Sequence, residues 1–153
     1  MAGAFQVRPA VPEDFGQWLP LWGSYNDFYG RSGATALPAT VTDTTWRRFF
    51  EEHEPIYALV AEADGELIGL AHYLFHRSTT AAAHSCYLQD LFTSKAARGS
   101  GVATALIHRV RDEAKAAGSP SVYWQTQETN DVARRLYDKI AQRSGFIVYR
   151  AMV

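Results

Sequence analysis

Two glycines at the beginning of a helical segment carry the clearest chemical signal in this sequence. Gly99 and Gly101 precede an apolar stripe that starts at Val102 and predicts a helix from Ser100 to Gly118. The first amides of a helix lack intrahelical acceptors and carry the positive end of the helix dipole. Because glycine has no side chain, a ligand can come close to such amides. This arrangement predicts a binding site for an anionic diphosphate.

Two familiar phosphate-binding loops do not fit these residues. A P-loop needs a Lys-Ser/Thr pair after its last glycine, and here Val102 and Ala103 follow. A dinucleotide fingerprint needs a small residue three positions after Gly101, where this chain has Thr104, and an acidic residue about twenty positions further on, which is missing. The glycine pair therefore belongs to another kind of loop.

The pattern Arg98-x-x-Gly101-x-Ala103, preceded by a strand ending in Leu-Gln-Asp-Leu-Phe-Thr93, resembles motif A of the Gcn5-related N-acetyltransferases (GNAT). The resemblance extends over essentially the whole chain. It implies one domain over residues 1–153 with an α+β fold, in which helices flank a central mixed, mostly antiparallel sheet and a splayed strand pair holds the cofactor. It also implies acetyl-CoA as co-substrate.

A second motif, Asn130-x-x-Ala133-x-x-Leu136-Tyr137, resembles a later cofactor-contacting segment of the same family. As a helix cap, Asn130 also has an ordinary structural role. Together the two motifs imply a set of cofactor-binding residues: backbone groups of Leu91, Phe92 and Thr93 for pantetheine, residues Arg98, Gly99, Ser100, Gly101, Val102, Ala103 and Thr104 for the pyrophosphate, and Asn130 and Tyr137.

Acetyl transfer from a thioester to an amine needs positioning, loss of a proton from the ammonium and an acid for the leaving thiolate. Family resemblance makes Tyr137 the general acid, a role that suits a phenol because it is protonated at neutral pH. The alternative is a tyrosine that only packs under the last strand.

The base is the less certain half of the chemistry. Related polyamine acetyltransferases carry Glu at the position of Gln89, and an amide cannot accept a proton at working pH. We predict Asp90 as the catalytic base, although strand alternation points it to the opposite face unless a bulge re-aims it. Glu128 and water alone are the alternatives, and Asp90 could instead be a buried structural carboxylate.

The same resemblance implies that Tyr29, Trp46, Gln89 and Glu128 line the acceptor pocket, whereas plain core packing is the alternative for the two aromatic residues. Seven residues, 138–144, separate Tyr137 from Gly145-Phe146, where the common pattern has three. This feature is similar to the yeast Hpa-type subgroup and predicts a longer last helix. The subgroup implies a small amine acceptor (a polyamine, an amino acid or a lysine side chain) and a homodimer formed partly through the C-terminal strand.

Hydrophobic periodicity and turn residues predict the order β-α-α-β-β-β-α-β-α-β. The expected helices begin at Pro12, with Pro20 kinking or dividing the first, at Thr42-Asp43, at Ser100 and at Thr129 or Asn130. The last helix has an expected inner stripe of Val132, Leu136 and Ile140. The expected strands are 5–8, 57–61, 67–75, 86–93, 121–126 and 146–149, with an Asp64-Gly65 turn between the second and the third.

Composition limits the remaining classes. A formal net charge of −1 gives no indication of a nucleic-acid partner, and no apolar run reaches membrane-spanning length. The single cysteine, Cys86, and an N-terminus without signal-peptide character predict a cytoplasmic protein. The pairs His72/His76 and His84/Cys86 lack a second ligand pair, so we expect no metal. A catalytically silent acyl-CoA-binding module stays open as the alternative, because Gln89 replaces the family's Glu.

Overall fold

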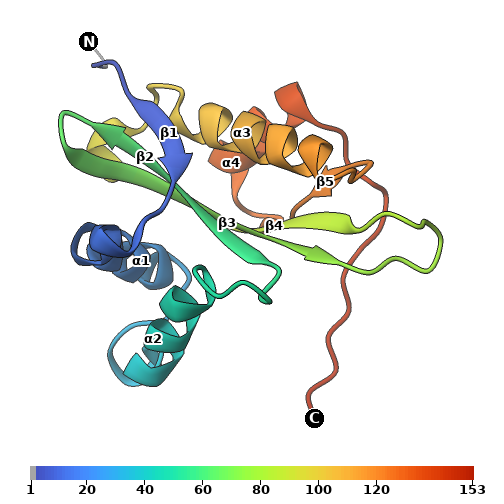
Figure 1. The fold of residues 1–153 in the computed structure, drawn as a ribbon, viewed down its shortest axis with the longest axis horizontal. Helices are drawn as coiled ribbons and strands as arrows, with labels where there is room; N and C mark the ends of the chain where they lie inside the picture. Colours follow the sequence, from blue (N-terminus) through green and yellow to red (C-terminus); the bar gives the residue numbers. More distant parts are fainter. Residues whose placement is uncertain (1–2) are drawn as a thin grey trace.

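A five-stranded sheet in the order β1-β2-β3-β4-β5 forms the centre of the computed structural model, which describes residues 3–153 (Figure 1). The strands are β1 (Gln6–Pro9), β2 (Ile56–Ala63), β3 (Glu66–His76), β4 (Ser85–Thr93) and β5 (Val122–Tyr123). The helices are α1 (Phe15–Phe28), α2 (Ala39–Arg48), α3 (Val102–Ala116) and α4 (Asp131–Ile140). Strands β1 to β4 pair antiparallel and β5 joins β4 in parallel. The predicted mixed, mostly antiparallel sheet is confirmed.

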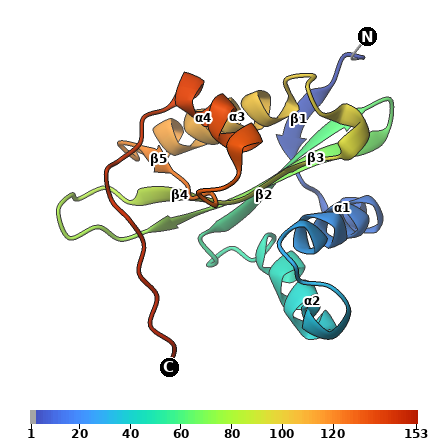
Figure 2. The ribbon, with the colours of Figure 1, turned by 180° about the vertical axis from the view of Figure 1, so that it is seen from behind.

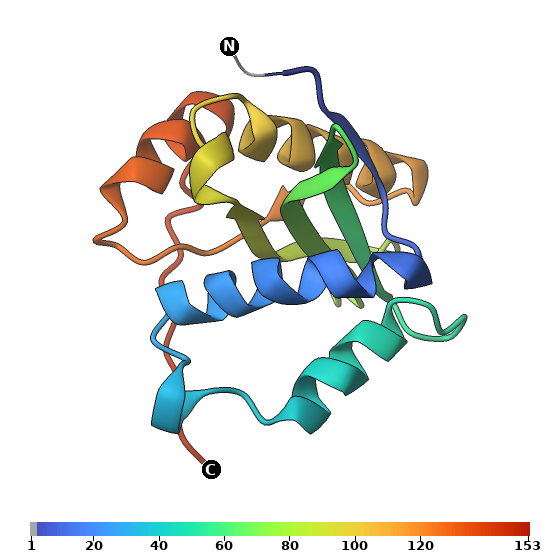
Figure 3. The ribbon, with the colours of Figure 1, turned by 90° about the vertical axis from the view of Figure 1, so that its left-hand side faces the viewer.

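Helices cover the two faces of the sheet as separate layers. Figures 1 and 3 show α1 and α2 on one face, and α3 and α4 on the other. Alternate residues of β3 face opposite layers, as the pleat requires. Leu70 packs in the cluster with Trp18 and Trp22 of α1, whereas its neighbour Ala71 packs in the cluster with Leu106 of α3.

The hairpin between β2 and β3 turns as predicted at Asp64 and Gly65. Both residues have positive φ angles, 50° and 79°, which is the geometry of the two-residue turns that match strand twist.

The start of α3 lies directly on the sheet at Gly69 of β3. A Cβ added to Gly69 would lie 2.8 Å from Cγ1 of Val102 and 3.1 Å from the carbonyl oxygen of Phe92. A side chain at position 69 would therefore collide with the first turn of α3. The sequence analysis did not identify this role of Gly69.

Several predicted boundaries were wrong. Pro20 does not divide the first helix, because it lies inside one continuous α1. The Gly16 carbonyl, which loses its helical hydrogen-bond donor at Pro20, belongs to an exposed residue that water can reach. Helix α2 begins at Ala39, three residues before the expected cap, because Pro38 precedes it with an extended backbone. Strand β5 ends at Tyr123, so residues 124–126 do not pair.

The C-terminal part differs most from the prediction. Helix α4 ends at Ile140, and the extra residues lie after it rather than lengthening it. Val132 is 78% exposed and does not belong to the inner stripe, whereas Ile140 packs against the core as expected, together with Tyr137. The expected strand 146–149 pairs with nothing within residues 3–153, and the segment leads away from the sheet (Figure 2).

Candidate active site

The sheet opens between β4 and β5. Only two residue pairs join these strands, Cys86 with Val122 and Tyr87 with Tyr123. Strand β4 then continues to Thr93 paired with β3 on its other side. The residues after Tyr87 thus expose one edge of backbone groups without a sheet partner among the described strands. The predicted splayed strand pair is present.

A β-bulge at Gln89 accompanies this opening. In the β3–β4 ladder, His72 pairs with Asp90 and Tyr73 pairs with Leu88, so Gln89 is the extra residue. Leu88 packs in the α3 cluster, whereas Asp90 bonds to α1 on the other face. The bulge therefore re-aims Asp90 into the α1 layer and leaves Gln89 exposed.

The loop before α3 has the geometry of an anion cradle. Within residues 3–153, the amides of 99–104 have no acceptor, and the first bond of α3 runs from the Ala105 amide to the Gly101 carbonyl at 3.0 Å. Gly99 and Gly101 have φ angles of 80° and 86°, and a Cβ at either position would meet nothing within 4 Å. Six consecutive donors at the positive end of a helix can hold an anionic group.

Two neighbouring features fit a coenzyme with a diphosphate and an amide-bearing arm. The Arg98 side chain donates from Nε to the Thr93 carbonyl at 3.3 Å and lies over the Phe92 ring at the cradle's edge. The Thr93 hydroxyl, at the end of β4, is buried and has no hydrogen-bond partner in the described part of the chain. A buried hydroxyl without a partner is costly, and a ligand group in the splay would satisfy it.

Asn130 and Tyr137 lie at the start and in the middle of α4. Asn130 caps the helix, accepting at Oδ1 from the Ala133 amide at 3.3 Å, so its expected capping role is confirmed. Tyr137 is half-buried, with its ring 5.4 Å from that of Trp124. Burial, with a smaller contribution from Tyr29, raises the pKa of Tyr137 to about 12. Its phenol therefore carries a proton throughout the neutral range.

A buried hydrogen-bond chain surrounds Asp90. The Tyr25 hydroxyl donates to Oδ1 of Asp90 at 2.6 Å, and Nδ1 of His72 lies 2.9 Å from Oδ2. On its other side, His72 receives the indole N–H of Trp18 at Nε2, at 3.0 Å. An indole nitrogen can only donate, so Nε2 of His72 is an acceptor and Nδ1 carries the proton that it donates to Asp90. Asp90 is thus an acceptor for both neighbours.

Burial raises the pKa of Tyr25 far above that of a free phenol, and the adjacent Asp90 charge raises it further. The same two causes, in the same order, raise the pKa of Tyr29, whereas the Arg31 charge opposes both shifts. Tyr29 therefore lies within electrostatic reach of Asp90 and Arg31. Sequence reasoning missed Tyr25 as an Asp90 partner and did not consider Arg31.

The other residues predicted for the acceptor side are dispersed. The Trp46 ring packs 4.6 Å from Trp18 in the aromatic cluster between α1 and α2. Glu128 is exposed in the loop after β5, where its carbonyl accepts from Arg134. Of that set, only Tyr29 and Gln89 lie beside the opening of β4, next to the Asp90 network.

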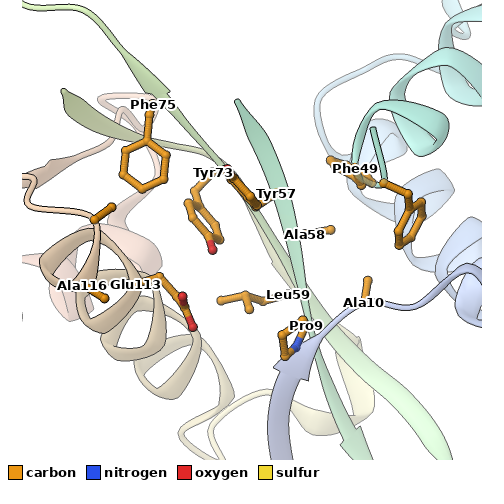
Figure 4. Close-up of a pocket in the computed structure, with 12 residues that line it drawn as sticks. Pro9, Ala10, Phe49, Tyr57, Ala58, Leu59, Tyr73, Phe75, Glu113 and Ala116 are labelled. Carbon is orange, nitrogen blue, oxygen red and sulfur yellow. The ribbon is translucent and has the colours of Figure 1, made fainter. Parts of the chain in front are cut away.

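A hollow of about 430 Å³ lies elsewhere, along β2 between the C-terminal turns of α2 and α3 (Figure 4). Apolar side chains such as Phe49, Tyr57 and Phe75 form most of its lining. Its one acidic side chain, Glu113, bonds to Arg109. No residue predicted to bind cofactor or acceptor lines this hollow, so we interpret it as a packing groove.

The described part of the chain has no cluster of three or more His, Cys, Asp or Glu side chains arranged to hold a metal ion. His72 is committed to Trp18 and Asp90, and His76 bonds to Tyr123. None of the helices found in residues 3–153 has both the length and the apolar character needed to cross a membrane.

Comparison with known proteins agrees with the fold. The sequence profile of the Acetyltransferase (GNAT) family matches residues 18–141. The D-amino-acid N-acetyltransferase HPA3 of Saccharomyces cerevisiae is 33% identical over 146 residues, covering 94% of this chain and 88% of that protein. The chain belongs to the GNAT family. Its activity class is that of an N-acetyltransferase.

Solved structures support the fold. A ribosomal-protein-alanine N-acetyltransferase from Brucella melitensis biovar Abortus 2308 superposes with a TM-score of 0.81 at 21% identity, covering 98% of this chain and all of that one. AAC(6')-Iy, solved with a bisubstrate analogue of CoA, superposes with a TM-score of 0.83 at 15% identity, covering 99% of each chain.

Proposed function

We propose that this protein transfers the acetyl group of acetyl-CoA to a primary amine of a small molecule. The observation that supports this most is the run of six amides, 99–104, which lack acceptors at the start of α3. Their number and direction suit a diphosphate, and both glycines leave room for one. An amino acid is among the acceptors we propose, in keeping with the name of the yeast relative.

The coenzyme, when bound, supplies the thioester; the chain supplies binding and proton movement. The amides of 99–104 and the Arg98 guanidinium hold the diphosphate, and backbone groups of 91–93 orient the arm along the unpaired edge of β4. Asn130 holds the start of α4, which positions Tyr137. Tyr137 donates its phenolic proton to the departing thiolate, and burial keeps that proton in place until it is needed.

Asp90 is the proposed base, acting through Tyr25. Because both carboxylate oxygens already accept hydrogen bonds, we propose a relay in which water takes the ammonium proton, Tyr25 accepts it and Tyr25 passes its own proton to Asp90. The neutral amine then attacks the acetyl carbon. Gln89 is exposed beside the bulge and contributes a polar amide rather than a base.

Release of free thiol from acetyl-CoA tests the proposal. The protein and acetyl-CoA are mixed with one candidate acceptor at a time: spermidine, a D-amino acid, an L-amino acid or a lysine peptide. Amine-dependent thiol release with at least one acceptor supports the enzyme. Tight acetyl-CoA binding without thiol release for any amine would favour the alternative, a silent acyl-CoA-binding module.

We also propose a homodimer formed through the C-terminal segment, residues 145–153. Four consecutive apolar side chains here are each more than two-thirds exposed: Phe146 91%, Ile147 74%, Val148 68% and Tyr149 87%. The segment has no strand partner among the described residues, while β5 has a neighbour on one edge only. Exposed apolar chain of this kind is stabilised by burial against another surface, and the partner we propose is a second copy.

Light scattering after gel filtration measures the mass of the particle directly. We expect a dimer for the native chain and a monomer for Val148→Asp, with Arg143→Asp as the matched control outside the apolar run. A monomeric native chain, or a Val148→Asp variant that remains dimeric, would contradict this arrangement.

A further inference from the structure

Arg31 is a partly buried arginine without a carboxylate partner. It follows α1, where its backbone amide donates to the Asn26 carbonyl at 2.9 Å. Its Nε donates to Oδ1 of Asn26 at 2.6 Å. No ion pair involves Arg31 among residues 3–153, and neither terminal guanidinium nitrogen has an acceptor within the same range. The fork of the guanidinium is therefore available to a ligand.

The side chain is fixed in place. Asn26 is 5% exposed, and its side-chain nitrogen Nδ2 donates to the Trp22 carbonyl at 2.8 Å. The side-chain oxygen Oδ1 is therefore held toward Arg31. The guanidinium carbon lies 5.7 Å from the ring centre of Tyr25 and 5.4 Å from that of Tyr29. These are cation–π distances. The arginine thus loses little conformational freedom when it binds an anion.

Opposite charges flank the two tyrosines at this place. Asp90 bonds to the hydroxyl of Tyr25, and Arg31 lies over the ring of the same tyrosine. Both charges act on Tyr29, whose ring centre lies 5.0 Å from that of Tyr25. An acceptor with an ammonium group near Asp90 and an anionic group near Arg31 would match this field.

We propose that Arg31 recognises a carboxylate on the acceptor, so that amino acids are preferred over amines that lack one. The planar guanidinium offers two parallel N–H donors, the geometry that a carboxylate accepts. This inference rests on the proposed acetyltransferase function and specifies its substrate class. Arg31 acts in binding and takes no part in moving protons.

Phenylalanine and phenethylamine test it, because they differ only in the carboxylate. For the native protein we expect kcat/KM to be at least about tenfold higher with phenylalanine, of the better enantiomer, since charged hydrogen bonds are the strong ones. In Arg31→Met the ratio should fall toward one, because phenylalanine alone loses the charged partner of its carboxylate. Arg31→Lys should be intermediate because it retains the charge but loses the fork.

The control is Arg135→Met, which removes an exposed arginine on α4, and thermal unfolding checks that each variant folds. An unchanged phenylalanine-to-phenethylamine ratio in Arg31→Met would overturn the inference while leaving the acetyltransferase intact. If no amine is acetylated, the proposed function fails by itself. Calorimetric titration of phenylalanine into the CoA-bound protein then decides the role of Arg31: equal affinity in the native protein and in Arg31→Met would overturn it.

Discussion

Replacing Gly101 with glutamate tests the anion cradle directly. Gly101 has a φ of 86° at the N-cap of α3, and a Cβ there would meet no atom within 4 Å. The substitution is therefore not blocked by bulk. It introduces backbone strain, which for an L-residue in the left-handed region costs about 1–2 kcal/mol, and it places a carboxylate among the donors proposed for a diphosphate.

The charge effect can be estimated. Two unit charges about 6 Å apart repel by roughly 0.7 kcal/mol in water and roughly 3 kcal/mol at the effective dielectric constant of a protein surface. A diphosphate carries more than one charge, so the upper part of this range applies. Since 1.4 kcal/mol corresponds to a factor of ten, we expect acetyl-CoA affinity to fall by about tenfold to a hundredfold.

The other end of the same helix offers a matched control. Gly118 also has a positive φ, 82°, and open space around its missing Cβ. Gly118→Glu therefore adds a similar strain and the same charge, far from the cradle, and its cost should appear in thermal unfolding but not in binding. Calorimetry with acetyl-CoA compares the two. Equal affinity in Gly101→Glu and Gly118→Glu would refute the placement of the diphosphate at α3.

Three further changes address other features. Gly69→Ala should destabilise the fold by about 1–3 kcal/mol in urea and weaken acetyl-CoA binding, because its Cβ would lie 2.8 Å from Val102; native stability would contradict the close packing of α3. Asp90→Asn should lower kcat and cost about 1–3 kcal/mol of stability, because it removes the charge to which the Tyr25 hydroxyl and the His72 ring donate; wild-type kcat would remove Asp90 from the relay. Burial raises the pKa of Tyr73, so this phenol binds its proton more tightly when folded, and above about pH 10 Tyr73 alone should contribute about 1.4 kcal/mol per pH unit to the fall in the free energy of unfolding; Tyr73→Phe should make the decline less steep by that amount, measured by urea unfolding from pH 8 to 11.

The cofactor side of the site was accessible to sequence reasoning because local residue types determine it. Gly99 and Gly101 adopt the left-handed backbone that glycine favours, and the apolar stripe from Val102 begins the helix where its amides are needed. Asn130 caps α4 as its residue type predicts. These features depend on neighbours within a few positions, so a single chain reveals them.

The acceptor side was not accessible in the same way because long-range contacts build it. Tyr25 meets Asp90 across 65 positions of sequence, and Trp18 meets His72 across 54. Nothing in the local pattern of α1 distinguishes these residues from ordinary core aromatics. Arg31 has only a short-range partner, Asn26, and its neighbourhood becomes apparent once α1 lies on the sheet.

The C-terminal residues show a different limit. The consecutive aromatic and β-branched residues at 146–149 predict a strand, and this reasoning is sound for a chain that has an edge to join. Among residues 3–153 of one copy the segment pairs with no such edge, and its side chains remain exposed. Sequence periodicity indicates the conformation of a segment but not which molecule provides its partner.

The extra residue in β4, Gln89, affects the bend of the strand separately from the faces to which its side chains point. Leu88 and Asp90 already face opposite sides of the sheet and pair with adjacent residues of β3. If Gln89 were deleted, these two residues would become neighbours in the chain, and their side chains would alternate as in a regular strand. Every later side chain would keep its face, and only the local bend would be lost. The presence or absence of the single residue Gln89 thus changes the curvature of this strand without changing the direction of its side chains.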